Sequence, residues 1–263
     1  MNWFEALVLG LIQGLTEFLP VSSSGHLELG KYLFGINPET NFYFTVAVHG
    51  ATVLSTVIVF WKEIGALLKG FVKFRFNDET KYILKIIVSM IPVAIAGLFM
   101  KDIIENFFKG NMIALGIEFL ITALFLIVPG FFNPKERPIT YLDAFVIGLA
   151  QAFAVLPAVS RSGATIATGL ILGNRKDEIA KFSFLMVLVP VIGANLVEMH
   201  SADFTPGETS PAIIITGFLV VFISGYAACK WMISLVNKGK LIWFAAYCIA
   251  IGIISILLGK NVF

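Results

Sequence analysis

The chain has 263 residues, of which 58% are hydrophobic and 14% are charged, and its formal net charge is +2. Ordinary soluble domains carry roughly 25% charged residues, so this composition excludes a typical soluble fold and indicates that lipid is the main solvent. The small net charge gives no indication of nucleic-acid binding.

The first segment, about 3 to 33, is apolar but broken near its middle. Its centre reads Glu17-Phe18-Leu19-Pro20-Val21-Ser22-Ser23-Ser24-Gly25-His26. A proline beside a cluster of Ser and Gly leaves backbone groups without partners, and lipid cannot satisfy them. A second segment, about 142 to 173, is broken at Pro157 in the same way. We expect both to be re-entrant helical hairpins.

Other segments are long and apolar enough to cross a bilayer. They run from about 42 to 61, 82 to 100, 112 to 132, 182 to 199, 211 to 235 and 241 to 258. The predicted fold class is an all-α polytopic membrane protein, with one hairpin and three transmembrane helices in each half.

The positions of Lys and Arg predict the orientation, because these residues gather on the cytoplasmic side. The connection after Trp61 is rich in them: Lys62, Lys69, Lys73, Arg75 and Lys81. The 201–210 loop has two acids and no Lys or Arg, so we expect it outside. Segment 142–173 then starts and ends inside, as a hairpin requires, and both termini are predicted to lie outside.

The two broken segments resemble each other at a constant offset of 138 residues. The matches are Glu5 with Asp143, Gly10 with Gly148, Gln13 with Gln151, Ser22 with Ser160, Ser24 with Ser162 and Gly25 with Gly163. Because three spans separate the hairpins, the second half is inverted. The repeats run from about 1 to 133 and from about 139 to 263 within a single membrane domain. In such folds the broken helices meet near mid-membrane and form an anion site. The alternative is chance similarity between Gly- and Ser-rich helices.

The hairpin tips carry ionisable groups in apolar surroundings. An unpaired charge there costs about 2.5 to 3.5 kcal/mol, so we expect partners for Glu17 and His26. Arg161 brings a planar cation whose donors match phosphate oxygens. These groups predict phosphate binding with acid/base or nucleophilic chemistry. The alternative for the serines is helix capping and packing.

We expect the phosphate groups to be bound by small residues of both tips, namely Ser22, Ser24, Gly25, Ser160, Ser162 and Gly163. Gln13, His49 and Thr165 are predicted to contact the residues that bind the phosphate groups rather than the phosphate groups themselves. His49 lies on the apolar face of a span, where a buried histidine is more often structural.

At these residues the chain resembles the undecaprenyl-diphosphate phosphatase family, which also confers bacitracin resistance. The resemblance covers nearly the whole chain and includes GLTEFLPVSSSGH at 14–26, VIVFW at 57–61, IPVAIAG at 91–97, SRSGATI at 160–166 and FSFL at 182–185. It implies hydrolysis of undecaprenyl diphosphate to undecaprenyl phosphate and inorganic phosphate, which recycles the lipid carrier for cell-wall synthesis. It also implies a plasma-membrane location, an active site on the outer side and a divalent cation, Mg or Ca.

Two residues depart from the family's motifs. The first motif is often written with two glutamates four residues apart, whereas here Gln13 precedes Glu17. A metal held between paired carboxylates is therefore in doubt, and Glu17 is the one metal ligand that the sequence offers. The second motif often has Gly after its proline, where this chain has Ala158.

We predict that Arg161, with the serines beside it, holds the diphosphate and offsets charge on the transferring phosphoryl group. His26 is expected to attack phosphorus or to activate the attacking group, with Glu17 fixing its tautomer. Ser23 is the rival nucleophile, and direct attack by water is the third option.

An alternative function is a transporter or flippase of polyprenyl phosphate lipids, because inverted repeats with broken helices are usual in transporters. A structural scaffold would leave the intramembrane charges without a purpose. The partners expected in every case are a polyprenyl diphosphate lipid and the bilayer, and the sequence leaves a homo-oligomer open.

Overall fold

The computed structural model describes residues 2–36, 42–99, 111–132, 135–156, 158–201 and 210–260, with the backbone alone for 42, 43 and 198–201. Within these residues the helices are joined by turns and irregular connections, and an isolated bridge pairs Arg137 with Asn174. The all-α prediction is therefore confirmed. Pro157 and most of the expected outer loop at 201–210 lie outside the described residues.

The first hairpin consists of α1 (Trp3–Thr16) and α2 (Ser23–Phe34). A capping box between Asn2 and Glu5 starts α1. The helix has 14 residues, about 21 Å, which is too short for a hydrocarbon core of about 30 Å. It therefore ends inside the protein.

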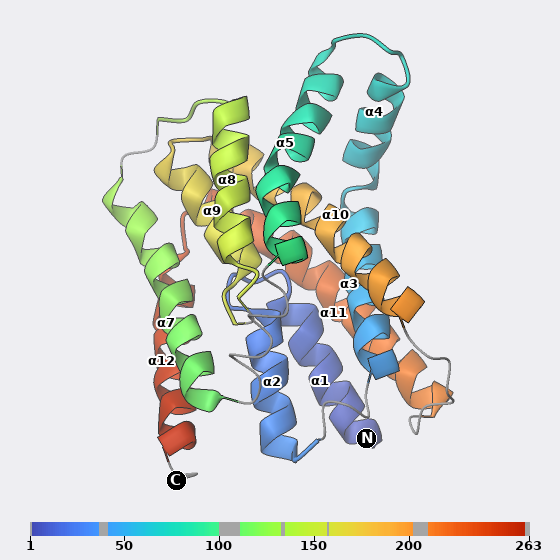
Figure 1. The fold of residues 1–263 in the computed structure, drawn as a ribbon, viewed down its shortest axis with the longest axis vertical. Helices are drawn as coiled ribbons and strands as arrows, with labels where there is room; N and C mark the ends of the chain where they lie inside the picture. The colour runs from blue at the N-terminus through green and yellow to red at the C-terminus, as the bar shows by residue number, and fades with distance from the viewer. Residues whose placement is uncertain are drawn as a thin grey trace.

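The second hairpin consists of α8 (Tyr141–Phe153) and α9 (Arg161–Ile171). A capping box between Thr140 and Asp143 starts α8, as the one between Asn2 and Glu5 starts α1. The two hairpins enter from opposite ends of the molecule, and their tips meet near its middle (Figure 1). This arrangement agrees with the predicted re-entrant hairpins and with their inverted orientation.

Longer helices surround the hairpins. They are α3 (Phe42–Val59), α5 (Asp78–Phe99), α7 (Met112–Ile127), continued by the 3-10 turn η2 (Val128–Phe131), α10 (Lys176–Ser201), α11 (Pro211–Asn237) and α12 (Ile242–Lys260). Among the described residues, α5, α7 with η2, α10, α11 and α12 are each long and apolar enough to cross a membrane, and α3 adds a sixth if it is counted with the helix that follows it. These six helices correspond to the six predicted spans, although α5 and α10 begin several residues earlier than predicted.

The connection after Trp61 is not a plain loop but contains the helix α4 (Trp61–Phe71). The chain bends by 75° between α3 and α4 at Phe60, whose backbone is not helical. Helix α4 then packs against α5, and an added Cβ on Gly70 would lie 2.5 Å from Glu79 Cβ. The basic residues predicted to be cytoplasmic therefore lie on an ordered helical hairpin.

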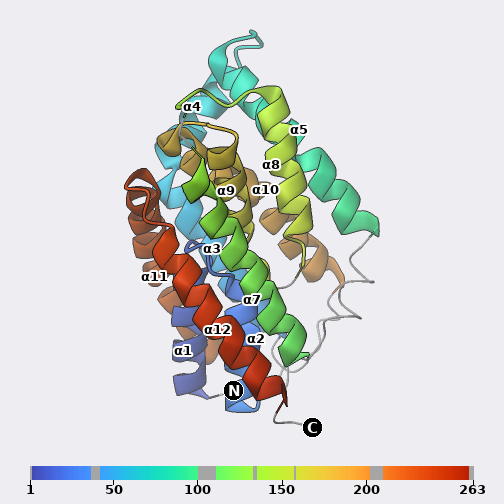
Figure 2. The ribbon, with the colours of Figure 1, turned by 90° about the vertical axis from the view of Figure 1, so that its left-hand side faces the viewer.

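Equivalent helices make equivalent contacts in the two halves. Helix α1 packs against α11, and α8 packs against α5. An added Cβ on Gly10 would lie 3.3 Å from the carbonyl oxygen of Gly217, and one on Gly148 would lie 2.3 Å from that of Ser89. A side chain at either matched position would therefore crowd another helix backbone, and the clash would be severe at Gly148. The helices α7 and α12 pack along each other (Figure 2).

Candidate active site

The first tip is a turn between two helices. Helix α1 ends at Thr16 with Glu17 as its C-cap, and α2 begins at Ser23. The N-cap Ser22 has a φ of 69°, a left-handed conformation that costs a non-glycine residue about 1 to 3 kcal/mol. Its Oγ accepts the N–H of Gly25 at 3.2 Å. The serine thus caps the helix while its backbone turns sharply into Ser23.

The second tip is built similarly but with a relaxed backbone. Ser160 is the N-cap of α9, with a φ of −69°, and its Oγ accepts the N–H of Gly163 at 3.1 Å. Arg161 is the first residue of the helix. An added Cβ on Gly163 would lie 3.4 Å from Pro20 Cβ, so the two tips approach each other closely.

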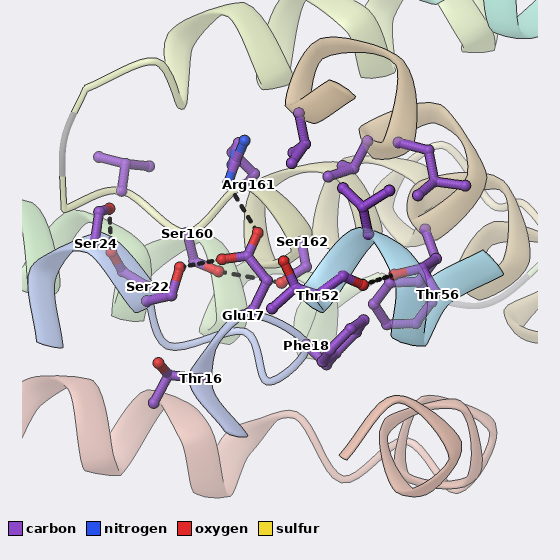
Figure 3. A pocket seen from close by; sticks show the side chains of 17 residues that line it. Thr16, Glu17, Phe18, Ser22, Ser24, Thr52, Thr56, Ser160, Arg161 and Ser162 are labelled. Carbon is purple, nitrogen blue, oxygen red and sulfur yellow. Dashed lines mark hydrogen bonds and ion pairs between the residues drawn. The ribbon is translucent and has the colours of Figure 1, made fainter. Parts of the chain in front are cut away.

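Glu17 is the centre of the polar contacts between the tips. Its Oε1 accepts a hydrogen bond from Arg161 Nη2 at 2.8 Å, and its Oε2 accepts one from Ser23 Oγ at 2.5 Å. Gln13 Nε2 donates to the same Oε2 at 3.0 Å. Figure 3 shows Arg161 pointing at the Glu17 carboxylate. The Glu17 side chain is 8% exposed and that of Arg161 is 32% exposed, so the ion pair is shielded on the glutamate side.

A pocket opens on this cluster, and its empty space, counted together with the open solvent at its entrance, is about 550 Å³. One part of its lining is polar and the other is apolar. The polar residues are Thr16, Glu17, Ser22, Ser23, Ser24, Thr52, Thr56, Ser160, Arg161 and Ser162, and the apolar ones are Phe18, Val53, Val159, Phe184, Val187, Leu188 and Val191. The pocket therefore suits an amphipathic molecule with an anionic head.

The serines bond to one another within each tip. Ser22 Oγ lies 3.4 Å from Ser24 Oγ, and Ser160 Oγ lies 3.3 Å from Ser162 Oγ. The predicted phosphate-binding serines are thus brought together at the pocket. The N–H groups of the two matched glycines are used by the capping hydroxyls, so the capping alternative holds for Ser22 and Ser160.

His26 lies apart from Glu17. Its Nδ1 is 2.6 Å from the carbonyl oxygen of Ser22, and its Nε2 is 2.8 Å from the hydroxyl of Tyr247 in α12. The residue is buried and does not line the pocket. The predicted contact in which Glu17 fixes the His26 tautomer is therefore wrong, because both ring nitrogens bond elsewhere.

Thr165 and His49, which were predicted to support the site, lie near the ion pair of Glu17 and Arg161. Thr165 is fully buried, donates to the carbonyl oxygen of Arg161 at 2.8 Å and bonds Ser183 at 2.6 Å. His49 is close enough to Glu17 and Arg161 for their charges to act on it. The predicted roles of these residues remain predictions.

Residues that the sequence interpretation missed come from α7 and α12. Glu118 in α7 is 2% exposed, and its Oε2 accepts the N–H of Ala158 at 3.1 Å. Thr122, one turn later, accepts the N–H of Ser160 at 3.0 Å. Glu118 could have been found, because a lone acid within an apolar span is a sign of function. Tyr247 carries no comparable signal.

The donor set at the tips does not form a metal site by itself. Within the described residues, His, Cys, Asp and Glu do not gather in any group of three that could hold an ion. Both oxygens of Glu17 already accept hydrogen bonds. A cation here would need most of its ligands from elsewhere.

Comparison with known proteins agrees with the motifs. A family profile described as bacitracin resistance protein BacA matches residues 6–254. An undecaprenyl-diphosphatase of Bacteroides fragilis is 50% identical over 264 residues, which covers 99% of each chain. One of Bacteroides thetaiotaomicron is 51% identical over 98% of this chain and 99% of its own. One of Carboxydothermus hydrogenoformans is 40% identical over 98% of both chains.

Proposed function

The chain belongs to the bacitracin resistance protein BacA family, and from that membership we propose that it is an undecaprenyl-diphosphatase whose chemistry takes place between the two hairpin tips. It hydrolyses undecaprenyl diphosphate to undecaprenyl phosphate and inorganic phosphate, which returns the lipid carrier to cell-wall synthesis. The observation that carries the site is the contact of Glu17 with both Arg161 and Ser23. It combines a carboxylate, a hydroxyl and a cation at the polar end of one pocket.

Ser23 is the nucleophile that the geometry favours. Its hydroxyl already donates to Glu17 Oε2, so the carboxylate can take the proton as the Ser23 oxygen attacks the terminal phosphorus. The bond to the bridging oxygen breaks, and undecaprenyl phosphate leaves. Water then attacks the phosphoserine and releases inorganic phosphate. His26 is less suited to attack because its Nε2 is occupied by Tyr247.

Arg161 stabilises the charge on the transferring group. A guanidinium has five N–H donors, and the contact with Glu17 takes one of them. The others can bind phosphate oxygens together with the serine hydroxyls of both tips. The first turns of α2 and α9 also begin here, and helix N-termini favour anions.

The prenyl tail fits the apolar side of the pocket. This side is lined by Phe184, Val187, Leu188 and Val191 of α10 together with Val53 of α3. Neither helix offers a charged side chain to this part of the lining, so the tail can lie between them without desolvating an ion. Recognition is therefore strict for the head group and loose for the tail.

The family resemblance raised the expectation of a divalent cation. Such a cation would bind together with the diphosphate. Mg²⁺ is commonly held by one or two carboxylates together with substrate phosphates and water. Glu17 is the carboxylate at this site, and the substrate would supply the remaining negative oxygens. Its contribution when bound would be to neutralise phosphate charge.

The orientation follows from charge. The beginning of α1 and the end of α12 lie at the same end of the molecule, and the α4–α5 turn lies at the opposite end (Figure 1). That turn carries Lys73 and Arg75, and Lys69 lies beside it in the last turn of α4. The basic end therefore faces the cytoplasm, and the first hairpin enters from the outer side.

Phosphate release from undecaprenyl diphosphate by the purified protein in detergent tests the function. Micelles have no sides, so turnover there distinguishes the enzyme from a transporter or flippase. We expect turnover that Arg161→Ala lowers by at least about 100-fold. Binding of the lipid without any phosphate release, with and without added Mg²⁺, would instead favour transport.

A further inference from the structure

Helices α7 and α12 form a close pair beside the two tips. Each is the third span of its half, and Figure 2 shows them side by side. An added Cβ on Gly116 would lie 2.5 Å from the carbonyl oxygen of Gly252, and one on Gly252 would lie 2.8 Å from that of Gly116. The two backbones therefore touch, and the pair has little freedom to slide.

Helix α7 holds the tip of the opposite half. Glu118 and Thr122 bind the N–H groups of Ala158 and Ser160, at 3.1 and 3.0 Å. These amides lie three residues and one residue before Arg161. Among the described residues, Glu118 Oε1 is buried without a partner, and its Oε2 bonds the Ala158 N–H of this tip. The position of Arg161 therefore depends on α7.

Helix α12 holds the other tip in return. The rings of Tyr247 and His26 are stacked, with centroids 5.5 Å apart and an interplanar angle of 4°. Since a carbonyl oxygen only accepts, His26 Nδ1 carries the proton toward Ser22, and the neutral ring's Nε2 accepts from the Tyr247 hydroxyl. His26 thereby holds the left-handed Ser22, and Ser23 follows directly.

We propose that Glu118 and Tyr247 are positioning residues, each on the last helix of one half, that together keep Arg161 and Ser23 aligned on Glu17. The inference rests on the proposed active site. Displacing a reacting group by about 1 Å can cost about 100-fold in rate, so contacts that fix the tips act on kcat. A merely structural role would lower stability and leave the turnover of the folded protein unchanged.

The test uses the full chain in detergent. We expect Tyr247→Phe, which keeps the ring and removes one hydroxyl, to lower kcat about tenfold while KM stays within about twofold. Tyr226→Phe is the matched control, since its hydroxyl bonds exposed Lys230 in α11. Glu118→Leu should lose at least as much activity, and Glu118→Gln should restore most of it because the amide oxygen can still accept the Ala158 N–H.

A spectroscopic readout separates positioning from stability. In protein labelled with ¹⁵N-histidine, the His26 Nε2 resonance should shift in Tyr247→Phe and stay in place in Tyr226→Phe. Unchanged kcat and unchanged resonances in Tyr247→Phe would overturn the proposal, even if Glu118→Leu fails to fold. Ser23→Ala and Arg161→Ala are measured in parallel, and full activity in both would show that the active site itself was misassigned.

Discussion

Arg161 Nη2 donates to Glu17 Oε1 across 2.8 Å, joining two residues that lie 144 positions apart in the chain. Glu17 ends the first helix of one hairpin, and Arg161 begins the second helix of the other. The acid and the cation therefore meet only when the two inverted halves have assembled. Because the acid and the cation come from different hairpins, the catalytic activity depends directly on how the two hairpins are aligned.

Replacing Arg161 separates charge from geometry. Arg161→Lys keeps a positive charge but loses the planar fork that binds two phosphate oxygens. We expect Arg161→Ala to lower kcat/KM by about 10² to 10³ and Arg161→Lys to recover only part of that loss. Steady-state phosphate release measures both. Wild-type activity in the lysine variant would show that charge alone suffices.

Ser23 can be tested by trapping. If it is the nucleophile, rapid quenching with phosphate-labelled substrate yields a label that survives acid, as phosphoserine does, whereas phosphohistidine is lost in acid. Ser23→Ala should abolish the label and lower kcat by at least about 10². Ser24→Ala removes a hydroxyl expected to bind phosphate but leaves the nucleophile in place, so it should still yield the label. An acid-labile product mapping to His26 would contradict the assignment, and no label at all would favour water.

The fold could be predicted largely from the sequence because each sequence pattern was compatible with only one arrangement in a membrane. A 14-residue apolar helix that ends at a proline and serine cluster cannot cross the bilayer, so the hairpin was the remaining option. The offset of 138 between Gly10 and Gly148 fixed the repeat, and each glycine proved to lie against another helix backbone. Helix α4 was missed although Trp61, Ile64, Leu68 and Phe71 recur at helical spacing. The bend at Phe60 that separates it from α3 has no marker in the sequence.

The sequence predicted which residues belong to the site better than it predicted which of them touch. Glu17 and Arg161 were expected at one site but in separate roles, and the ion pair between them was not predicted. Glu17 and His26, nine positions apart, were expected to touch, but the turn at Ser22 directs the imidazole toward Tyr247 on a distant helix. Glu118 and Thr122 of α7 and Tyr247 of α12 reach the tips through tertiary packing. Periodicity and motif spacing in the sequence do not predict such contacts.

Restoring a carboxylate at position 13 tests the cation. Gln13 now donates to Glu17 Oε2 at 3.0 Å, and Gln13→Glu would replace that bond with repulsion between two carboxylates one turn apart. A divalent cation between them would relieve it. We expect activity without added Mg²⁺ to fall about tenfold and saturating Mg²⁺ to restore it. Gln13→Ala, which removes the bond without adding charge, should not gain this dependence. Identical Mg²⁺ responses in the two variants would contradict the prediction.

The first turns of α1 and α8, where the two hairpins begin, differ in how many contacts fix them. Asp143 is 4% exposed and accepts two hydrogen bonds from the Arg137 guanidinium and a third from Asn174 at 3.1 Å. The matched residue of the first hairpin, Glu5, is half-buried and bonds only Asn2 among the contacts described, and these bonds are exposed to solvent.

Removing the charge at these matched positions should therefore have unequal effects. Because the Arg137 side chain is 37% exposed, we expect Asp143→Asn to cost about 1 to 3 kcal/mol, between the values for surface and buried pairs. Glu5→Gln should cost at most about 0.5 kcal/mol. Thermal unfolding in detergent compares them. Equal shifts in Tm would mean that the Arg137 pair does not anchor the second hairpin, whereas the expected difference would show that the first hairpin is the less firmly tethered of the two.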